Sequence, residues 1–192
     1  MLKSVCKLLD EADFVIAHNG ARFDLPKIKG YALMAGVPIP SPYRVIDTCL
    51  IARREFGFES NSLEYLAKIL DCTEKDSHKK FPGFELWLEC LRNNPEAWEE
   101  LKDYNIQDVD TLEEVYLKIR PYSSTHPNVN TGDDLTEIHC PKCGSDDSER
   151  RGFYNTNVGK FQRYRCKSCG GWHRSRYTEN SIEVRKALTT SA

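Results

Sequence analysis

Two cysteine pairs near the C-terminal end of the sequence have the residue type and spacing of a metal site. Each pair is a C-x-x-C, Cys140–Cys143 and Cys166–Cys169, and 22 residues lie between the pairs. Four thiolates at this spacing are typical of a tetrahedral zinc site. Gly144 and Gly170 follow the pairs and let the backbone turn back, so that its amides point at the sulfurs. We therefore predict a structural Zn²⁺, rather than a disulfide or a redox pair, with the ligands Cys140, Cys143, Cys166 and Cys169.

The segment between and after the cysteine pairs is basic and aromatic, a composition that suits nucleic-acid binding. Residues 140–178 carry nine Lys and Arg against three Asp and Glu. Arginine and lysine contact phosphates while bases stack on exposed aromatic rings. The alternative is that the aromatic side chains form the core of so small a module. We assign Phe153 and Tyr164 to that core and Tyr177 to the contact surface. The residues most expected to bind nucleic acid are Arg163, Trp172 and Arg174.

A second candidate site lies in the N-terminal part, where a short apolar run ends and a helix starts. The run Phe14–Ala17 is typical of a buried parallel strand, and His18–Gly20 follows it as a turn. Ligands bind at the carboxyl ends of strands in open α/β sheets, so Asp24 is well placed for a site. The alternatives are that Asp24 is a helix-start acid favoured by the dipole and that His18 is structural.

Tyr104 and Asp108 form a third candidate, because they lie four residues apart in a segment with helical periodicity. At this spacing the two side chains share one helix face. A carboxylate and a phenol so paired can hold a divalent cation and orient a water molecule. The alternative is an amphipathic helix with a half-buried tyrosine and a solvated acid. We expect Asp47, which follows another apolar pair, to cap a helix rather than bind metal.

The elements that must position these residues alternate between strands and helices, which predicts an α/β fold. Pro121 ends the last long helix, and residues 121–138 are predicted to be a linker. A zinc-ribbon module at 139–178 and a tail at 179–192 follow. Strands are predicted at 14–17 and 45–46, and helices at 2–13, 24–35, 48–55, 63–70, 84–92 and 95–119.

The composition of the sequence argues against a membrane-spanning or secreted protein. Residues 1–120 carry 16 basic and 21 acidic side chains, so an acidic body precedes the basic module. No apolar run is long enough for a membrane span and no signal peptide is present, which predicts a cytoplasmic protein without a membrane partner. The four cysteines outside the pairs lie in helix-like or strand-like segments, where we expect reduced, partly buried thiols.

Taken in order, these pieces resemble a known family. A strand ending in H-N-G-x-x-F-D (His18–Asp24), a strand followed by D-T (Asp47–Thr48) and a late Y-x-x-x-D (Tyr104–Asp108) resemble motifs of the DnaQ-like 3′–5′ exonucleases. These are the DEDD group, tyrosine subclass, of the ribonuclease H-like fold, and the match is also similar to the exonuclease domain of family-B DNA polymerases. The resemblance covers about residues 1–120. With the CPKCG and CKSCGGW segments, the chain resembles phage-encoded proteins that join such a nuclease to a zinc ribbon.

The resemblance implies a chemistry and roles for particular residues. In such enzymes four carboxylates hold two Mg²⁺ or Mn²⁺ ions about 4 Å apart at the scissile phosphate. Asp24 and Asp108 would each bind an ion, and Tyr104 would orient the attacking water. Asn19 and Phe23 would support the turn and the terminal nucleotide.

The chain departs from the family pattern at the first motif, a D-x-E on the central strand. The acidic residues ahead of His18 belong to a helix end, so we expect an incomplete ribonuclease H-like domain that lacks its first strands, with a weak metal site. Three explanations stay open. The missing strands come from a separate N-terminal nuclease fragment, the reading frame is truncated, or the chain is an inactive remnant that binds nucleic acid.

The sequence therefore predicts a metal-dependent 3′–5′ exonuclease, or half of a split one, with a zinc ribbon that holds nucleic acid. The expected partner is single-stranded DNA or a 3′ end, together with a nuclease fragment or a replication protein. One alternative is a catalytically inactive, zinc-ribbon nucleic-acid-binding protein. Another is a protein-interaction adaptor.

Overall fold

The computed structural model describes residues 1–73, 80–132 and 135–191. The chain divides into two compact units, Met1–Ile119 and Arg120–Ala192. No helix in the described ranges is long and apolar enough to cross a membrane.

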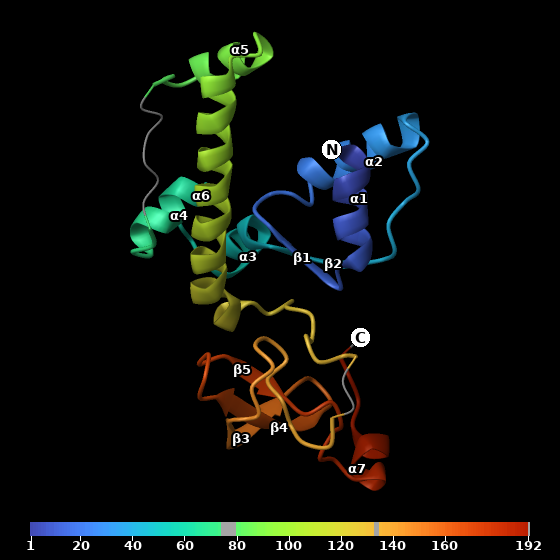
Figure 1. Ribbon diagram of the computed structural model, residues 1–192. Coiled ribbons are helices and arrows are strands. Elements are labelled where there is room, and N and C mark those ends of the chain that lie inside the picture. The colour runs from blue at the N-terminus through green and yellow to red at the C-terminus, as the bar shows by residue number, and fades with distance from the viewer. Residues whose placement is uncertain (74–79, 133–134, 192) are drawn as a thin grey trace. The chain divides into compact units, whose positions relative to one another are not determined.

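The N-terminal unit opens with a βαβ arrangement (Figure 1). The strands β1 (Phe14–Ala17) and β2 (Arg44–Asp47) are parallel, with Ala17 opposite Asp47, so their carboxyl ends meet at one edge. Parallel strands need a crossover connection, and this one contains α2 (Asp24–Met34). The helix α1 (Leu2–Glu11) precedes β1 and packs against α2, and α3 (Thr48–Glu55) follows β2 without a loop.

A long helix organises the rest of this unit. The helix α6 (Pro95–Ile119) packs against α3, α4 (Leu63–Ile69) and α5 (Glu85–Leu91), as Figure 1 shows. The main core lies where α3 and α4 meet the C-terminal half of α6. Its buried members are Ile46, Ile51, Ala52, Leu66, Ala67, Cys72, Val115, Tyr116 and Ile119.

The four cysteines of this unit are buried and unpaired, as the sequence predicted. Burial is the main cause that raises the pKa of the Cys49 and Cys72 thiols, which keeps them protonated and unreactive. The other two are Cys6 and Cys90.

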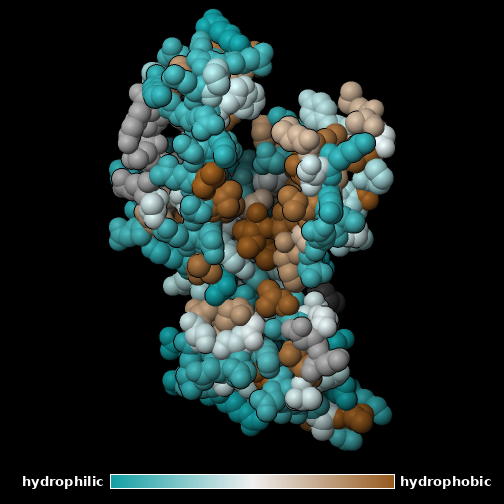
Figure 2. Space-filling model, viewed as in Figure 1, coloured by the Kyte–Doolittle hydropathy of each residue, from teal (hydrophilic) through white to brown (hydrophobic). Residues whose placement is uncertain are grey.

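Not all apolar side chains of this unit are covered. Ile16 of β1 is 40% exposed and Val45 of β2 is 36% exposed, although a strand in a parallel sheet is normally buried on both faces. Figure 2 shows hydrophobic residues gathered on the visible surface of the N-terminal unit. The expectation of a fully buried strand at 14–17 is therefore corrected by this exposure.

The C-terminal unit is built on a three-stranded antiparallel sheet in the order β3–β4–β5. Its strands are β3 (Ser148–Asn155), β4 (Lys160–Cys166) and β5 (Trp172–Arg174). A short turn joins β3 to β4, with the Thr156 amide donating to the Gly159 carbonyl over 2.8 Å. The 3-10 helix η1 (Arg120–Tyr122) begins the unit, and α7 (Ile182–Ala187) lies in the C-terminal tail.

The segment that the sequence suggested as a linker takes part in this unit. Ser123 and Asn130 are buried, and the Asn130 side-chain amide donates to the Cys140 carbonyl over 3.1 Å. The Val129 amide donates to the Pro141 carbonyl over 2.9 Å. These contacts attach the segment to the first cysteine pair.

Candidate functional site

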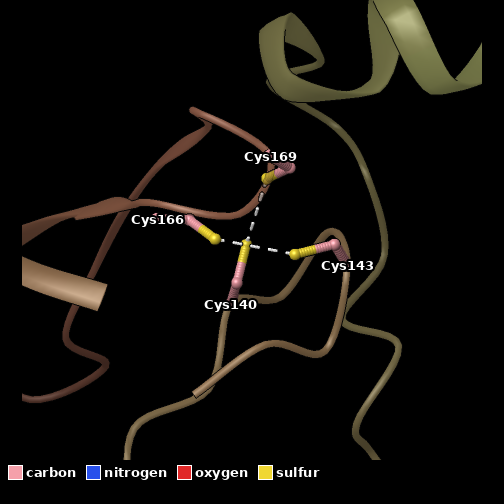
Figure 3. Close-up of side chains that lie close together, drawn as sticks. All are labelled: Cys140, Cys143, Cys166 and Cys169. Atoms are coloured by element: carbon pink, nitrogen blue, oxygen red, sulfur yellow. Dashed lines mark hydrogen bonds between the residues drawn. The ribbon is translucent and has the colours of Figure 1, made fainter. Parts of the chain in front are cut away.

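The four cysteine sulfurs converge from two loops of the C-terminal unit (Figure 3). The Sγ atoms of Cys140 and Cys169 lie 3.7 Å apart, and those of Cys143 and Cys166 lie 3.6 Å apart. Zn–S bonds of about 2.3 Å place the corners of a regular tetrahedron about 3.8 Å apart, so this spacing suits a zinc ion. All four ligand atoms lie within 4.8 Å of one another, and all four cysteines are free of disulfides. The predicted cysteine cluster is confirmed.

Two tight turns shape the cluster. Gly144 and Gly170 have φ angles of 80° and 75°, a region that favours glycine. Their amides donate to the carbonyls of Cys140 and Cys166 over 2.9 and 3.0 Å. The next amide after the second turn, Gly171 N, donates to the Cys169 sulfur over 3.4 Å, as expected for a zinc knuckle.

The two buried cysteines of the cluster have thiol pKa values that are shifted in opposite directions. Burial raises the pKa of the Cys140 thiol to about 12. At Cys166 burial also raises the pKa, but hydrogen bonds from the Cys169 and Ser168 amides and from the Cys143 thiol outweigh it and lower the pKa to about 7. A bound cation would therefore offset the effect of burial at Cys140 by favouring its thiolate form.

The cysteine pairs are flanked by two histidines, His139 and His173. Neither is among the clustered ligands. The His173 Nε2 lies 3.0 Å from the Ser148 hydroxyl, and its ring stacks on Tyr164 with centroids 5.3 Å apart. Tyr164 is 5% exposed, so its assignment to the core is confirmed. His173 helps to build this small core.

The other core assignment, Phe153, is wrong. Phe153 is 44% exposed because it lies on the edge strand β3, opposite the polar Gln162, and the Lys160 ammonium lies 3.9 Å from its ring centroid. An edge strand has a neighbour on one side only, which leaves such a ring partly in solvent.

One face of the sheet combines arginines with aromatic rings. Strand register places Arg163 opposite Arg174, and the Arg163 guanidinium lies 4.8 Å from the Trp172 ring centroid. Arg174 lies 3.9 Å from the Phe161 ring centroid and 5.6 Å from that of Tyr154. We call these five side chains the arginine–aromatic face. The structure thus brings together the residues that the sequence predicted to contact nucleic acid, Arg163, Trp172 and Arg174.

In the N-terminal unit, Asp47 lies at the edge where β1 and β2 end and makes several hydrogen bonds there. Asp47 is 5% exposed, and its carboxylate accepts four backbone N–H groups. Two of them come from the first turn of α3, Cys49 at 3.0 Å and Leu50 at 3.3 Å. The other two come from the turn after β1, Asn19 at 2.8 Å and Ala21 at 3.1 Å. The expectation that Asp47 caps a helix is confirmed.

His18 connects the same turn to the loop that contains Asn61 through hydrogen bonds. Its Nε2 donates to the Asn61 carbonyl over 2.9 Å, and its Nδ1 lies 2.8 Å from the Thr48 hydroxyl. The Thr48 hydroxyl in turn lies 3.1 Å from the Ala17 carbonyl. Both ring nitrogens therefore serve the fold, which supports the structural interpretation of His18.

The predicted site residues of this turn lie close together. Asn19 has a φ of 60°, and Gly20 is buried with so little space that an added Cβ would lie 2.6 Å from the Ala17 Cβ. Phe23 is 54% exposed, with the Lys27 ammonium 3.6 Å from its ring centroid. Asp24 is exposed and begins α2.

The other predicted pair lies within α6. Tyr104 is half-buried, and its ring meets Trp87 of α5 edge-on with centroids 6.3 Å apart. Asp108 is also half-buried, and its Oδ1 atom is excluded from solvent. Asp108 therefore differs from the fully solvated acid of the alternative interpretation.

Within the described part of the chain, the structure assembles the cysteine site but no comparable carboxylate site. Among the described residues, the four cysteines form the sole group of three or more potential ligands within 4.8 Å of one another. Asp24 begins α2, which packs against α1, whereas Asp108 lies on α6, which packs against α3, α4 and α5. The sequence did not predict that the Asp47 carboxylate accepts backbone amides from two separate segments. The one sequence feature that pointed to this residue was the D-T pair at a strand end.

Comparison with known proteins gives one match. A family model described as RNase_H superfamily matches residues 1–120. Neither the comparison with curated proteins nor that with solved structures finds a match. The matched range covers more than half of the sequence and the whole N-terminal unit, so the chain belongs to the RNase_H superfamily.

Proposed function

We propose that this protein is a metal-dependent nuclease of the 3′–5′ exonuclease type, with a C-terminal zinc module that holds the nucleic acid. The observation that carries the proposal is the RNase_H superfamily match over residues 1–120. A superfamily can host several activities, so the specific reaction is argued from residues.

In this proposal Asp24 and Asp108 bind Mg²⁺ or Mn²⁺, and Tyr104 orients the attacking water. Bound divalent ions would stabilise charge on the attacking and leaving oxygens of a phosphodiester. The solvent-excluded oxygen of Asp108 and the exposed position of Asp24, just after the turn that Asp47 organises, support these assignments.

The described residues lack a group of three carboxylates, so they do not form a complete two-ion site. We propose that further carboxylates come from a separate polypeptide that adds strands beside β1 and β2. The partial exposure of Ile16 and Val45 supports this part of the proposal, because added strands would cover them.

The zinc module would supply affinity for the substrate. The arginine–aromatic face offers cations for phosphates and rings for bases, without a pattern that selects a particular sequence. Either DNA or RNA strands fit this chemistry, and we propose single-stranded DNA as the natural substrate.

The proposal is tested by cleavage of single-stranded DNA with Mn²⁺, using the zinc-loaded, full-length protein, first alone and then together with the separate polypeptide that would supply the missing carboxylates. A label at the 5′ end reports stepwise shortening from the 3′ end. Asp108→Asn is expected to remove cleavage because the carboxylate is lost while the side chain keeps its size. Asp110→Asn, an exposed position on the same helix, is the matched control and should retain activity. Cleavage that survives in Asp108→Asn contradicts the assignment.

A second candidate function is nucleic-acid binding without catalysis. The observation that favours it is the lack of a carboxylate cluster among the described residues, beside a well-formed cysteine cluster. Binding of single-stranded DNA by a protein that cleaves neither DNA nor RNA with Mn²⁺, alone or with the polypeptide that would supply the missing carboxylates, would select this function. A protein that binds no nucleic acid would instead point to an adaptor role for the zinc module.

A further inference from the structure

A groove of about 660 Å³ runs beside β5 within the C-terminal unit. This volume lies within the range of pockets that hold small organic ligands. One side is formed by β5 and the residues after it, and the other by η1, the segment that follows it and the first cysteine loop. The lining residues that matter here are Tyr122, Ser123, Lys142, Trp172, Arg174 and Arg176.

The groove carries positive charge on several sides. Lys142, Arg174 and Arg176 line it, and none of the described lining residues is acidic. Lys142 is 8% exposed, and its ammonium donates to the Pro121 carbonyl, which holds the charge in place. Arg174 donates to the Ser175 carbonyl over 3.1 Å and lies over Phe161, so its guanidinium is also held. Such fixed cations favour a ligand with phosphate groups.

Ser123 gives a second and independent indication of a ligand. The residue is 1% exposed, lines the groove, and its hydroxyl has no hydrogen-bond partner among the described residues. A buried hydroxyl without a partner is costly, and such groups are rare in folded proteins. A ligand oxygen or nitrogen at the groove would satisfy it.

Trp172 adds a flat apolar surface to these polar groups. Its side chain is 47% exposed and belongs to both the groove and the arginine–aromatic face. A base inside a duplex has both faces covered by its neighbours, whereas a base of a single strand can offer a face to an indole. Phosphate-binding cations beside an open indole therefore favour a single strand over a duplex.

We propose that this groove binds a nucleotide unit of single-stranded nucleic acid, with the base on Trp172, the phosphates at Arg174 and Arg176, and a hydrogen bond from Ser123. The proposal rests on the nucleic-acid-binding part of the proposed function. It names a site for the strand that the arginine–aromatic face alone does not define.

The test measures fluorescence anisotropy of a labelled oligothymidylate of roughly 12 nucleotides, within the size range of small single-strand sites. The zinc-loaded, full-length protein is used without added Mg²⁺ or Mn²⁺, so that no cleavage interferes. Arg176→Ala and Trp172→Ala are each expected to weaken binding roughly tenfold, since stacking and phosphate contacts are lost. Ser123→Ala should weaken binding roughly threefold and leave the melting temperature unchanged, because its hydroxyl has no protein partner to lose.

Matched controls distinguish binding in the groove from general electrostatic attraction of nucleic acid to a basic surface. Arg185→Ala removes the same charge from α7, outside the groove, and should change binding by less than about twofold. A self-complementary duplex of equal length should compete poorly. The proposal is overturned if Arg185→Ala weakens binding as much as Arg176→Ala, if the duplex competes equally, or if the oligothymidylate does not bind.

The same measurements distinguish this site from the proposed nuclease. Loss of binding in Arg176→Ala, with no cleavage by the wild-type protein either alone or with the polypeptide that would supply the missing carboxylates, would keep the groove and reject the enzyme. Cleavage that depends on Asp108, with equal binding by the wild-type protein and Arg176→Ala, would keep the enzyme and reject the groove.

Discussion

At the scale of single residues, Asp47 shows how one buried carboxylate organises the end of a sheet. It joins the turn after β1 to the first turn of α3 through four backbone N–H groups. An anion also suits the positive end of a helix dipole. Because its oxygens are already engaged, Asp47 positions the neighbourhood of Asp24 and is a poor candidate for a metal ligand.

Replacing Asp47 tests this organising role. Asp47→Ala leaves four amides without their acceptor, and we expect the free energy of unfolding of the N-terminal unit to fall by about 1–3 kcal/mol. Urea unfolding followed by far-UV circular dichroism measures the change. Asp13→Ala, at an exposed acid just before β1, is the control and should stay within about 0.5 kcal/mol of the wild type. A similar loss in both variants would contradict the role.

His126 is the residue that should make the C-terminal unit sensitive to pH. Burial lowers its pKa from the ordinary value of 6.5, the Pro127 carbonyl opposes this, and the positive charges of Lys142 and Arg120 lower it further. The folded unit therefore holds a neutral ring at a pH where the unfolded chain is protonated. The unfolded state then binds more protons, so the stability is complete above about pH 6.5 and falls as the pH drops below it.

The expected result is a smaller loss of stability in His126→Gln than in the wild type between pH 7.5 and pH 5.5. Thermal unfolding of the zinc-loaded protein at the two pH values measures it. Some pH dependence should remain, because burial also lowers the pKa of His173, with Lys142 as a smaller cause. Equal pH dependence in the two proteins would show that His126 is not responsible.

At the scale of elements, the C-terminal unit combines a small core with a cysteine cluster that could hold a zinc ion. Its sheet has three short strands, and Tyr164 is a buried aromatic side chain at its centre. So small a fold needs an added constraint, and a structural zinc ion contributes roughly 10–16 kcal/mol in comparable modules. The Ser145 and Ser168 hydroxyls, 2.7 Å apart, also join the two cysteine loops.

Removal of zinc should therefore unfold this unit selectively. We expect a strong chelator to collapse the amide NMR signals of β3, β4 and β5 into the narrow range of unfolded chains, while signals from α6 persist. Cys140→Ser should lose the bound zinc, measured by metal analysis of the purified protein. Cys90→Ser, at a buried cysteine outside the cluster, should keep it. Retention of the sheet in metal-free protein would contradict a structural role for zinc.

At the scale of the whole molecule, charge and chemistry are divided along the chain. The acidic residues 1–120 match the RNase_H superfamily, and the basic residues 140–178 carry the cations and rings of the arginine–aromatic face. A basic module raises the local concentration of a polyanion near an acidic body that would otherwise repel it. This division fits the proposed function, in which one unit binds the nucleic acid and the other acts on it.

Local patterns in the sequence predicted much of the fold. The strand at 14–17 and the helices at 48–55 and 95–119 have the predicted bounds, and the other predicted helices differ by one or two residues at their ends. Apolar periodicity, the Ser62 cap and the proline at position 121 determine these boundaries, and all of them act within a few residues. The C-x-x-C spacing predicted the cysteine cluster for the same reason.

The sequence by itself determined the local elements, the metal ligands and the separation of acidic from basic chemistry, because each depends on neighbouring residues. Only the tertiary structure decided that Asp47 collects amides from two segments, that Phe153 is exposed and that residues 121–126 form one wall of a groove. These features depend on which distant segments pack together. Which segments pack together depends on burial and hydrogen bonding over the whole chain, so it cannot be predicted from a short stretch of sequence.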